Sequence, residues 1–300
     1  EASYDSLLTG TAGKLTTSTD AKQSEIPNSE LSFIPAQNGY NIALTIDLKI
    51  QNIVEKYLKQ AVETYSCNNG GNCIVMNPST GEILAMASYP NYDLNSPFTP
   101  TSYYANDWDN LSDSDKTKRI YEMWKVRSVS ETYEPGSVFK LITASIALEE
   151  GITGTDISGD FFCSGTETVS GTPIKCWRYY NPHQGESLRD AIMNSCNPAF
   201  IQLSKRIGAT TIYKYLEAYG LFDKTNIGLS GESAGIFYPL NKVGSVELAT
   251  MSFGQRFTIT PLQMITSIAS IANGGNLMQP RIIKSMTNTD TGEITYTTPT

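Results

Sequence analysis

The sequence predicts an α+β fold in which an antiparallel sheet is flanked by helices and joined to a mostly helical subdomain. The first observation is a helical pattern of apolar residues after Asp47. The second is a pair of strand-like runs, residues 73–77 and 82–88, that follows this helix and is joined by a short turn. The third is a series of helical patterns in the second half of the chain. A helix that leads into a hairpin indicates α+β rather than a parallel βαβ layout.

The part of the chain after residue 40 begins with a strand at residues 41–46. Asp47 is typical of a helix N-cap, and residues 68–71 (Asn-Asn-Gly-Gly) end the helix. The turn at residues 77–81 carries Pro and Gly where a hairpin needs them. We expect the helix to bury the face made of Ile50, Ile53, Val54, Tyr57, Leu58, Ala61, Val62 and Tyr65.

The regions before and after this strand, helix and hairpin look less regular. Residues 1–40 are thin in apolar periodicity and read as a linker or the remnant of a preceding domain. Residues 90–125 look loop-rich, and their acidic run at 107–115 reads as a solvated surface. Their aromatic side chains are expected to serve packing rather than to line a groove.

The second half supplies the helical subdomain. A helix follows Pro135-Gly136 and ends at Gly151. Residues 152–187 read as loop and short strands. Further helices follow Ser187, Pro198, Thr210 and Pro261, and strands are expected at residues 281–286 and 294–298.

Charge and composition exclude some functions. The net charge is −8 and the pI is about 4.8, whereas a nucleic-acid partner favours a basic face, so no nucleic-acid partner is expected. Hydrophobic residues make up 40% of the 300, enough for a sizeable core. No apolar run approaches the length of a membrane-spanning helix.

The five cysteines leave several pairings open. Cys67 with Cys73, and Cys163 with Cys176, are close in sequence and could form local disulfides, with Cys196 unpaired. No C-x-x-C occurs, and the single histidine cannot complete a zinc set of the usual spacing. We therefore expect no metal and no cofactor.

A serine and a lysine three residues apart begin the helix after Pro135-Gly136. Ser137 and Lys140 share a face of the first turn, at the positive end of the helix dipole. A nucleophilic serine needs a base. G-x-S-x-G does not occur, and the one histidine lies in a loop without an evident carboxylate, so a Ser-His-Asp triad is disfavoured. A lysine whose pKa is depressed by burial is the remaining candidate. A serine and a lysine at this spacing are common by chance, so the spacing alone does not show that the pair is catalytic, and the rest of the chain has to be considered.

A second polar element, Ser195-Cys196-Asn197, lies between two predicted helices. A loop tip there can project a hydroxyl and an amide into a cleft. The simpler interpretation is a helix N-cap, and a similar triplet at residues 66–68 reads as a cap or turn.

Taken in order, these motifs resemble those of the class B penicillin-binding proteins. The resemblance rests on residues 133–140 (Tyr-Glu-Pro-Gly-Ser-Val-Phe-Lys), 195–200 (Ser-Cys-Asn-Pro-Ala-Phe), 253–255 (Phe-Gly-Gln) and 260–263 (Thr-Pro-Leu-Gln). Residues 44–51 and 74–88 are similar to the family's opening of the catalytic domain, and the likeness covers about residues 40–290.

The resemblance implies a serine β-lactamase/transpeptidase-like fold and a serine acyl-transfer mechanism. By position, Ser137 is the nucleophile, Lys140 its base, Ser195 a proton relay, and Asn197 the residue that holds the substrate amide and orients Lys140. It also implies D-Ala-D-Ala stem peptides and β-lactams as ligands, membrane proteins of division or sporulation as partners, and a place on the extracytoplasmic side of the bacterial cell membrane. The backbone N–H of Ser137 is expected to supply half of an oxyanion hole.

The family's third motif, Lys-Thr/Ser-Gly, is missing. No lysine in the chain is followed by Thr-Gly or Ser-Gly. We therefore expect a chain truncated at its C-terminus, with residues 1–40 as linker or pedestal remnant and 41–300 as a transpeptidase domain without its last strands. Two other functions stay open: a β-lactamase or β-lactam sensor, and a catalytically silent scaffold.

Overall fold

Helices and antiparallel strands alternate through the computed structural model, which describes residues 2–16 and 32–300. The strands are β1 (Lys14–Thr16), β2 (Ser32–Ile34), β3 (Tyr40–Leu44), β4 (Gly71–Met76), β5 (Ile83–Tyr89), β6 (Phe161–Cys163), β7 (Thr166–Val169), β8 (Thr172–Lys175), β9 (Gln184–Glu186), β10 (Ile283–Asn288) and β11 (Ile294–Tyr296). The α-helices are α1 (Asp5–Leu8), α2 (Leu48–Thr64), α3 (Asp113–Met123), α4 (Arg127–Ser130), α5 (Lys140–Glu149), α6 (Leu188–Met193), α7 (Asn197–Ile207), α8 (Ala209–Ala218), α9 (Ser245–Met251) and α10 (Pro261–Ala272). The described residues also form the 3₁₀ turns η1 (Ala2–Tyr4), η2 (Trp108–Asn110), η3 (Gly136–Phe139) and η4 (Leu240–Lys242).

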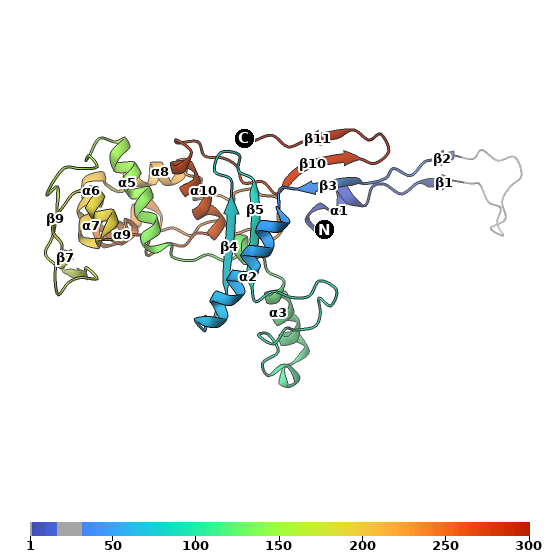
Figure 1. Ribbon diagram of the computed structural model, residues 1–300, viewed down its shortest axis with the longest axis horizontal. Coiled ribbons are helices and arrows are strands. Elements are labelled where there is room, and N and C mark those ends of the chain that lie inside the picture. Colours follow the sequence, from blue (N-terminus) through green and yellow to red (C-terminus); the bar gives the residue numbers. More distant parts are fainter. Residues whose placement is uncertain (1, 17–31) are drawn as a thin grey trace, which may run out of the picture.

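The elements form distinct regions along the long axis of the molecule (Figure 1). One end is mostly helical and holds α5 to α9 with the short strands β6 to β9. The hairpin β4–β5 and α2 lie in the middle, and α3 lies to one side of them. The sheet β11-β10-β3 and the ribbon β1–β2 occupy the other end (Figure 1). This is the predicted α+β arrangement of antiparallel strands, flanking helices and a helical subdomain.

The hairpin and its preceding helix form as the sequence predicts. The Asp47 carboxylate accepts hydrogen bonds from the N–H groups of Lys49 and Ile50, which makes it the N-cap of α2. Gln51 of α2 bonds both backbone groups of Met86 in β5, at 3.1 and 2.9 Å. These bonds hold α2 on β5, while β4 pairs with β5 alone among the described strands.

The apolar face of α2 is less buried than its periodicity predicts. Val62 is buried, but Ile53 is 56% exposed, Tyr57 58% and Tyr65 78%. A single two-stranded hairpin is narrower than the apolar stripe of this helix, so half of the predicted face lies in solvent.

The second sheet joins the ends of the described chain. β10 pairs antiparallel with β11 on one side and with β3 on the other. The Thr45 hydroxyl donates to the carbonyl of Ile83 at 2.7 Å, and the N–H of Asp47 donates to Leu84, so this sheet is tied to the start of β5.

The main core lies in the helical end and positions the site described below. Buried side chains of η3, β6, the helices α5 to α8 and the turn after α8 pack together; the largest are Phe139, Phe161, Phe200, Ile142, Ile146, Leu188, Leu203, Ile212, Leu216 and Leu221. Phe139 meets Phe257 edge-on at 4.8 Å between ring centroids. The start of α5 is therefore fixed by packing on its inner side.

The sequence analysis missed helices α1, α3, α4 and α9. α3 lies where an irregular solvated region was expected, and it is capped by the Ser112 hydroxyl, which accepts from the N–H of Asp115. Two of the acidic residues interpreted as surface charge stand in its first turn, where the helix dipole favours them. Ile120 and Met123 pack with Tyr104, in line with the expected structural role of the aromatic residues. α9 is short, and its apolar pattern gave no helical period.

The N-terminal region contains more structure than a linker. η1, α1 and the ribbon β1–β2 occur within residues 2–16 and 32–34, while residues 17–31 lie outside the described part. The interpretation of residues 1–40 as a remnant of a preceding domain stays a prediction. Within residues 2–16 and 32–300, no helix has the length and apolar content needed to cross a membrane.

Candidate active site

Ser137 lies exposed in η3, immediately before α5. The turn is held by Gly136, whose N–H donates to the carbonyl of Gly254 at 2.9 Å. A Cβ on Gly254 would come within 2.2 Å of the Gly136 oxygen, and the φ of Gly254 is +79°. Only glycine fits there without strain. The Phe-Gly-Gln motif of the sequence thus lies directly behind the serine.

Lys140 is the first residue of α5 and points into the core, with 2% of its surface exposed. Its Nζ donates to the Ser195 carbonyl at 2.8 Å, to the Ser195 hydroxyl at 3.0 Å and to Oδ1 of Asn197 at 2.8 Å. The ring of Phe200 lies 5.4 Å away. Burial lowers the pKa of Lys140 from 10.5 to about 8, and nearby acidic groups oppose part of this shift.

Ser195 connects the lysine to the exposed serine. Its hydroxyl donates to Oγ of Ser137 at 3.0 Å and accepts from Lys140. It lies between α6 and α7 with φ of +50°, a conformation that costs a non-glycine residue about 1 kcal/mol or more. Asn197 begins α7. A strained loop residue that carries a buried hydrogen-bond network is a common feature of functional sites.

The hydrogen bonds form one path, from Ser137 through Ser195 to Lys140. Within the described residues, no direct hydrogen bond joins Ser137 to Lys140. When Lys140 is an ammonium, its three protons serve three acceptors and none can accept a proton from the path. When Lys140 is neutral, its lone pair can accept from Ser195, which can then accept from Ser137. Because the pKa of Lys140 is about 8, about a tenth of the lysine is neutral at pH 7.

A shallow apolar groove of about 270 Å³ flanks the serine turn. Val138 and Tyr133 line one side, Asn72 and Ile74 of β4 another, and Met264 and its neighbours in α10 the third. Val138, which follows Ser137 in the chain, lines this groove, so the groove lies next to the serine turn.

The four residues predicted from the motifs come together in one place. Ser137, Lys140, Ser195 and Asn197 are joined by hydrogen bonds although the two pairs are 55 or more residues apart in sequence. The similar triplet at residues 66–68 lies in the turn between α2 and β4, as expected.

The cysteines differ from the sequence-based expectation. All five, each within the described residues, are free thiols, so neither of the local disulfides is present. Cys163, Cys176 and Cys196 are buried beside His183, and their potential ligand atoms lie within 4.8 Å of one another. The sequence analysis considered only zinc sets of the usual local spacing and did not predict this cluster, which the fold gathers from four separate segments.

The family comparison identifies a known domain. Residues 71–300 match the family model for the penicillin binding protein transpeptidase domain. Stage V sporulation protein D of Bacillus subtilis is 36% identical over 285 residues, which cover 95% of this chain and 41% of that protein. Peptidoglycan D,D-transpeptidase FtsI of Escherichia coli is 28% identical over 275 residues, which cover 92% and 42%. The chain thus spans about two fifths of the length of these relatives.

Solved structures agree with this fold. A peptidoglycan synthetase from Bifidobacterium adolescentis superposes with a TM-score of 0.79 at 27% identity, covering 99% of this chain and 50% of that one. Penicillin-binding protein A of Mycobacterium tuberculosis, as its ceftriaxone acyl-enzyme, gives a TM-score of 0.71 at 30% identity, covering 89% and 58%.

Proposed function

Because the chain belongs to the transpeptidase-domain family of penicillin-binding proteins, in its class B branch, we propose that it carries the acylation site of a peptidoglycan D,D-transpeptidase. The observation that supports this most is the hydrogen-bonded path Ser137–Ser195–Lys140. It links an exposed hydroxyl to a buried amine of lowered pKa, which is what a serine nucleophile with a lysine base requires.

Acylation starts with the neutral form of Lys140. Ser137 Oγ attacks the carbonyl between the two D-alanines, and its proton moves to Ser195 while the Ser195 proton moves to Lys140. The C–N bond of the substrate then breaks and an ester forms on Ser137. The leaving D-alanine amine takes a proton back along the same path. Asn197 keeps Lys140 in place through its side-chain oxygen.

Deacylation needs an amine from a second stem peptide. This amine attacks the ester carbonyl, the C–O bond to Ser137 breaks, and the new amide cross-links the two stems. The attacking amine loses a proton to the neutral Lys140 through Ser195, and Ser137 recovers a proton from the same path as it leaves. β-Lactams would acylate the same serine, a proposal supported by the acyl-enzyme of the Mycobacterium tuberculosis relative.

The substrate, location and partners of the protein are proposed from the names of its relatives. Relatives named for sporulation and for peptidoglycan transpeptidation support peptidoglycan as substrate. We further propose action on the extracytoplasmic side of the cell membrane, with membrane proteins of division or sporulation as partners.

The test is D-alanine exchange by the full-length protein. A synthetic stem pentapeptide ending in D-Ala-D-Ala is incubated with a labelled D-amino acid, and exchanged product is measured by mass spectrometry. We expect exchange in the wild type and none in Ser137→Ala. Hydrolysis of nitrocefin with rapid turnover, without exchange, would contradict a transpeptidase and indicate a β-lactamase. Exchange that persists in Ser137→Ala would show that Ser137 is not the nucleophile.

A further inference from the structure

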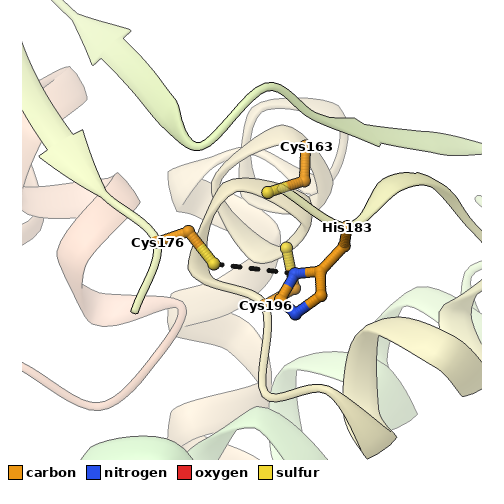
Figure 2. Close-up of side chains that lie close together, drawn as sticks. All are labelled: Cys163, Cys176, His183 and Cys196. Atoms are coloured by element: carbon orange, nitrogen blue, oxygen red, sulfur yellow. Dashed lines mark hydrogen bonds between the residues drawn. The ribbon is translucent and has the colours of Figure 1, made fainter. Parts of the chain in front are cut away.

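A cluster of three thiols and one imidazole lies in the core of the helical end. It consists of Cys163, Cys176, His183 and Cys196, which we call the Cys₃His cluster. Figure 2 shows their side chains converging from separate segments of the chain. The three cysteines are at most 1% exposed, and the His183 side chain is 2% exposed. None of these side chains belongs to the proposed acyl-transfer path.

The distances in the cluster suit one metal ion. All four ligand atoms lie within 4.8 Å of one another, and Nδ1 of His183 is 3.6 Å from Sγ of Cys176 (Figure 2). A tetrahedral zinc ion with Zn–S of about 2.3 Å and Zn–N of about 2.0–2.1 Å places its ligand atoms about 3.5–3.8 Å apart. The His183–Cys176 pair already has that spacing, and no pair needs to close by more than about 1 Å.

Buried polar groups beside the cluster have unmet hydrogen-bonding capacity. Nε2 of His183 and Oε2 of Glu186 have no partner within the described residues. Oε1 of Glu186 accepts from Asn194 at 2.9 Å and lies 3.8 Å from Nδ1 of His183. A buried polar oxygen without a partner is costly, and a positive charge close by can offset part of that cost. A divalent cation in the cluster supplies that charge.

The protonated cluster has no such compensation. Without a cation, the three thiols and the imidazole are buried together and offer one another only weak hydrogen bonds. A disulfide between two of the thiols would involve neither the third thiol nor the imidazole. A bound cation accounts for all four residues together.

We propose that the Cys₃His cluster binds one Zn²⁺ ion in a closed, structural site. Three thiols lose their protons to solvent on binding, the imidazole binds as the neutral ring, and no oxidation or reduction is involved. The preference for zinc follows from the ligands, since soft thiolates with one imidazole in tetrahedral geometry suit zinc better than calcium, magnesium or manganese. Glu186 lies beside the site as a carboxylate neighbour of the histidine ligand.

The site also bears on the loop that carries the proposed relay. Cys196 is the residue between Ser195 and Asn197, and it is the N-cap of α7. A metal bond at Cys196 joins this loop to β6 through Cys163 and to the segment after β8 through Cys176. The left-handed conformation of Ser195 is thereby held from within the core. This consequence rests on the proposed function, whereas metal binding itself does not.

The experiment measures metal in the full-length protein, purified without chelator and without added metal. Elemental analysis should give about one zinc per chain. After exchange with Co²⁺, the visible spectrum should show the intense d–d bands of tetrahedral cobalt and thiolate-to-cobalt charge transfer. The spectrum is read on the wild-type protein, so it tests the site even if a variant fails to fold.

Variants identify the ligands. Cys163→Ser and His183→Ala should lose most of the zinc, whereas the double variant Cys67→Ser/Cys73→Ser, which changes thiols outside the cluster, should keep it. Metal content that is equal in all of these proteins would overturn the proposal. So would wild-type protein without zinc whose Co²⁺ spectrum lacks the tetrahedral bands, or an unreduced digest in which Cys163 and Cys176 form a disulfide. D-alanine exchange is scored separately, so a failed metal site and a failed transpeptidase are distinguishable.

Discussion

The pH dependence of acylation tests the proposed role of Lys140 quantitatively. Only the neutral amine can accept a proton through Ser195, and burial lowers the pKa of Lys140 to about 8. The neutral fraction is then about 1% at pH 6, 9% at pH 7, 50% at pH 8 and 91% at pH 9. The acylation rate should rise about ninefold from pH 6 to 7, about fivefold from pH 7 to 8, and less than about twofold from pH 8 to 9.

The assay is the rate of labelling of the full-length protein by a fluorescent penicillin under pseudo-first-order conditions. Circular dichroism at each pH serves as the control for folding. A lysine with its ordinary pKa would give a rate that still rises about tenfold between pH 8 and 9. Such a profile, or one that is flat from pH 6 to 9, would refute the reasoning.

Further predictions concern single residues and the metal. Ser195→Ala should slow labelling by about 10²-fold or more, because the path between Ser137 and Lys140 is broken; an unchanged rate would rule out the relay. Asn197→Asp keeps the hydrogen-bond acceptor but adds a negative charge, which raises the pKa of Lys140 by about 1–3 units. Labelling at pH 7 should therefore fall about 10- to 1,000-fold and recover at higher pH. A labelling rate that does not recover at higher pH would count against Lys140 as the base. Gly254→Ala should lower the free energy of unfolding by at least about 1 kcal/mol and slow labelling. The control Gly231→Ala, with φ of +78° but nothing within 4 Å of the new Cβ, should destabilise the fold only through backbone strain. Equal denaturation midpoints for the two variants would contradict the close contact between Gly254 and Gly136. Removal of zinc by a chelator should lower the thermal midpoint of unfolding, since zinc at a thousand times its Kd stabilises the fold by about 4 kcal/mol. Zinc added back should restore the midpoint. A midpoint that does not change on chelation would oppose a structural metal.

The proposed acyl-transfer residues were predictable because each pair lies within a local motif. Ser137 and Lys140 are one helical turn apart, and Ser195 and Asn197 flank a single residue, so spacing and helix caps locate them. The order of the motifs then indicated a family that places the two pairs together. The resemblance implied a relay role for Ser195, but it did not predict that Ser137 and Lys140 would lack a direct hydrogen bond within the described residues. The hydrogen bonds of Ser195 depend on its left-handed conformation, which no residue type signals in advance.

The Cys₃His cluster was not predictable by the same reasoning. Its members are 7 or 13 residues apart from one to the next, and short zinc motifs place ligands two to five residues apart within each half. The cluster forms because the hairpin β7–β8 brings Cys163 and Cys176 to its base, and because α7 starts beside them. Its one sequence signal was the odd number of cysteines together with a single histidine in the same region.

The exposed side of α2 shows another limit of periodicity. The apolar repeat correctly predicted a helix but not which part of its face would be covered. Coverage depends on the width of the neighbouring hairpin, which is a tertiary property.

The most direct test of the central claim is the site of β-lactam attachment. The full-length protein is reacted with a penicillin, digested, and its peptides are analysed by mass spectrometry. The account predicts one adduct, on the peptide that contains Ser137, and its loss in Ser137→Ala. An adduct on any other serine, or no adduct on folded protein, would contradict the assignment of the acylation site.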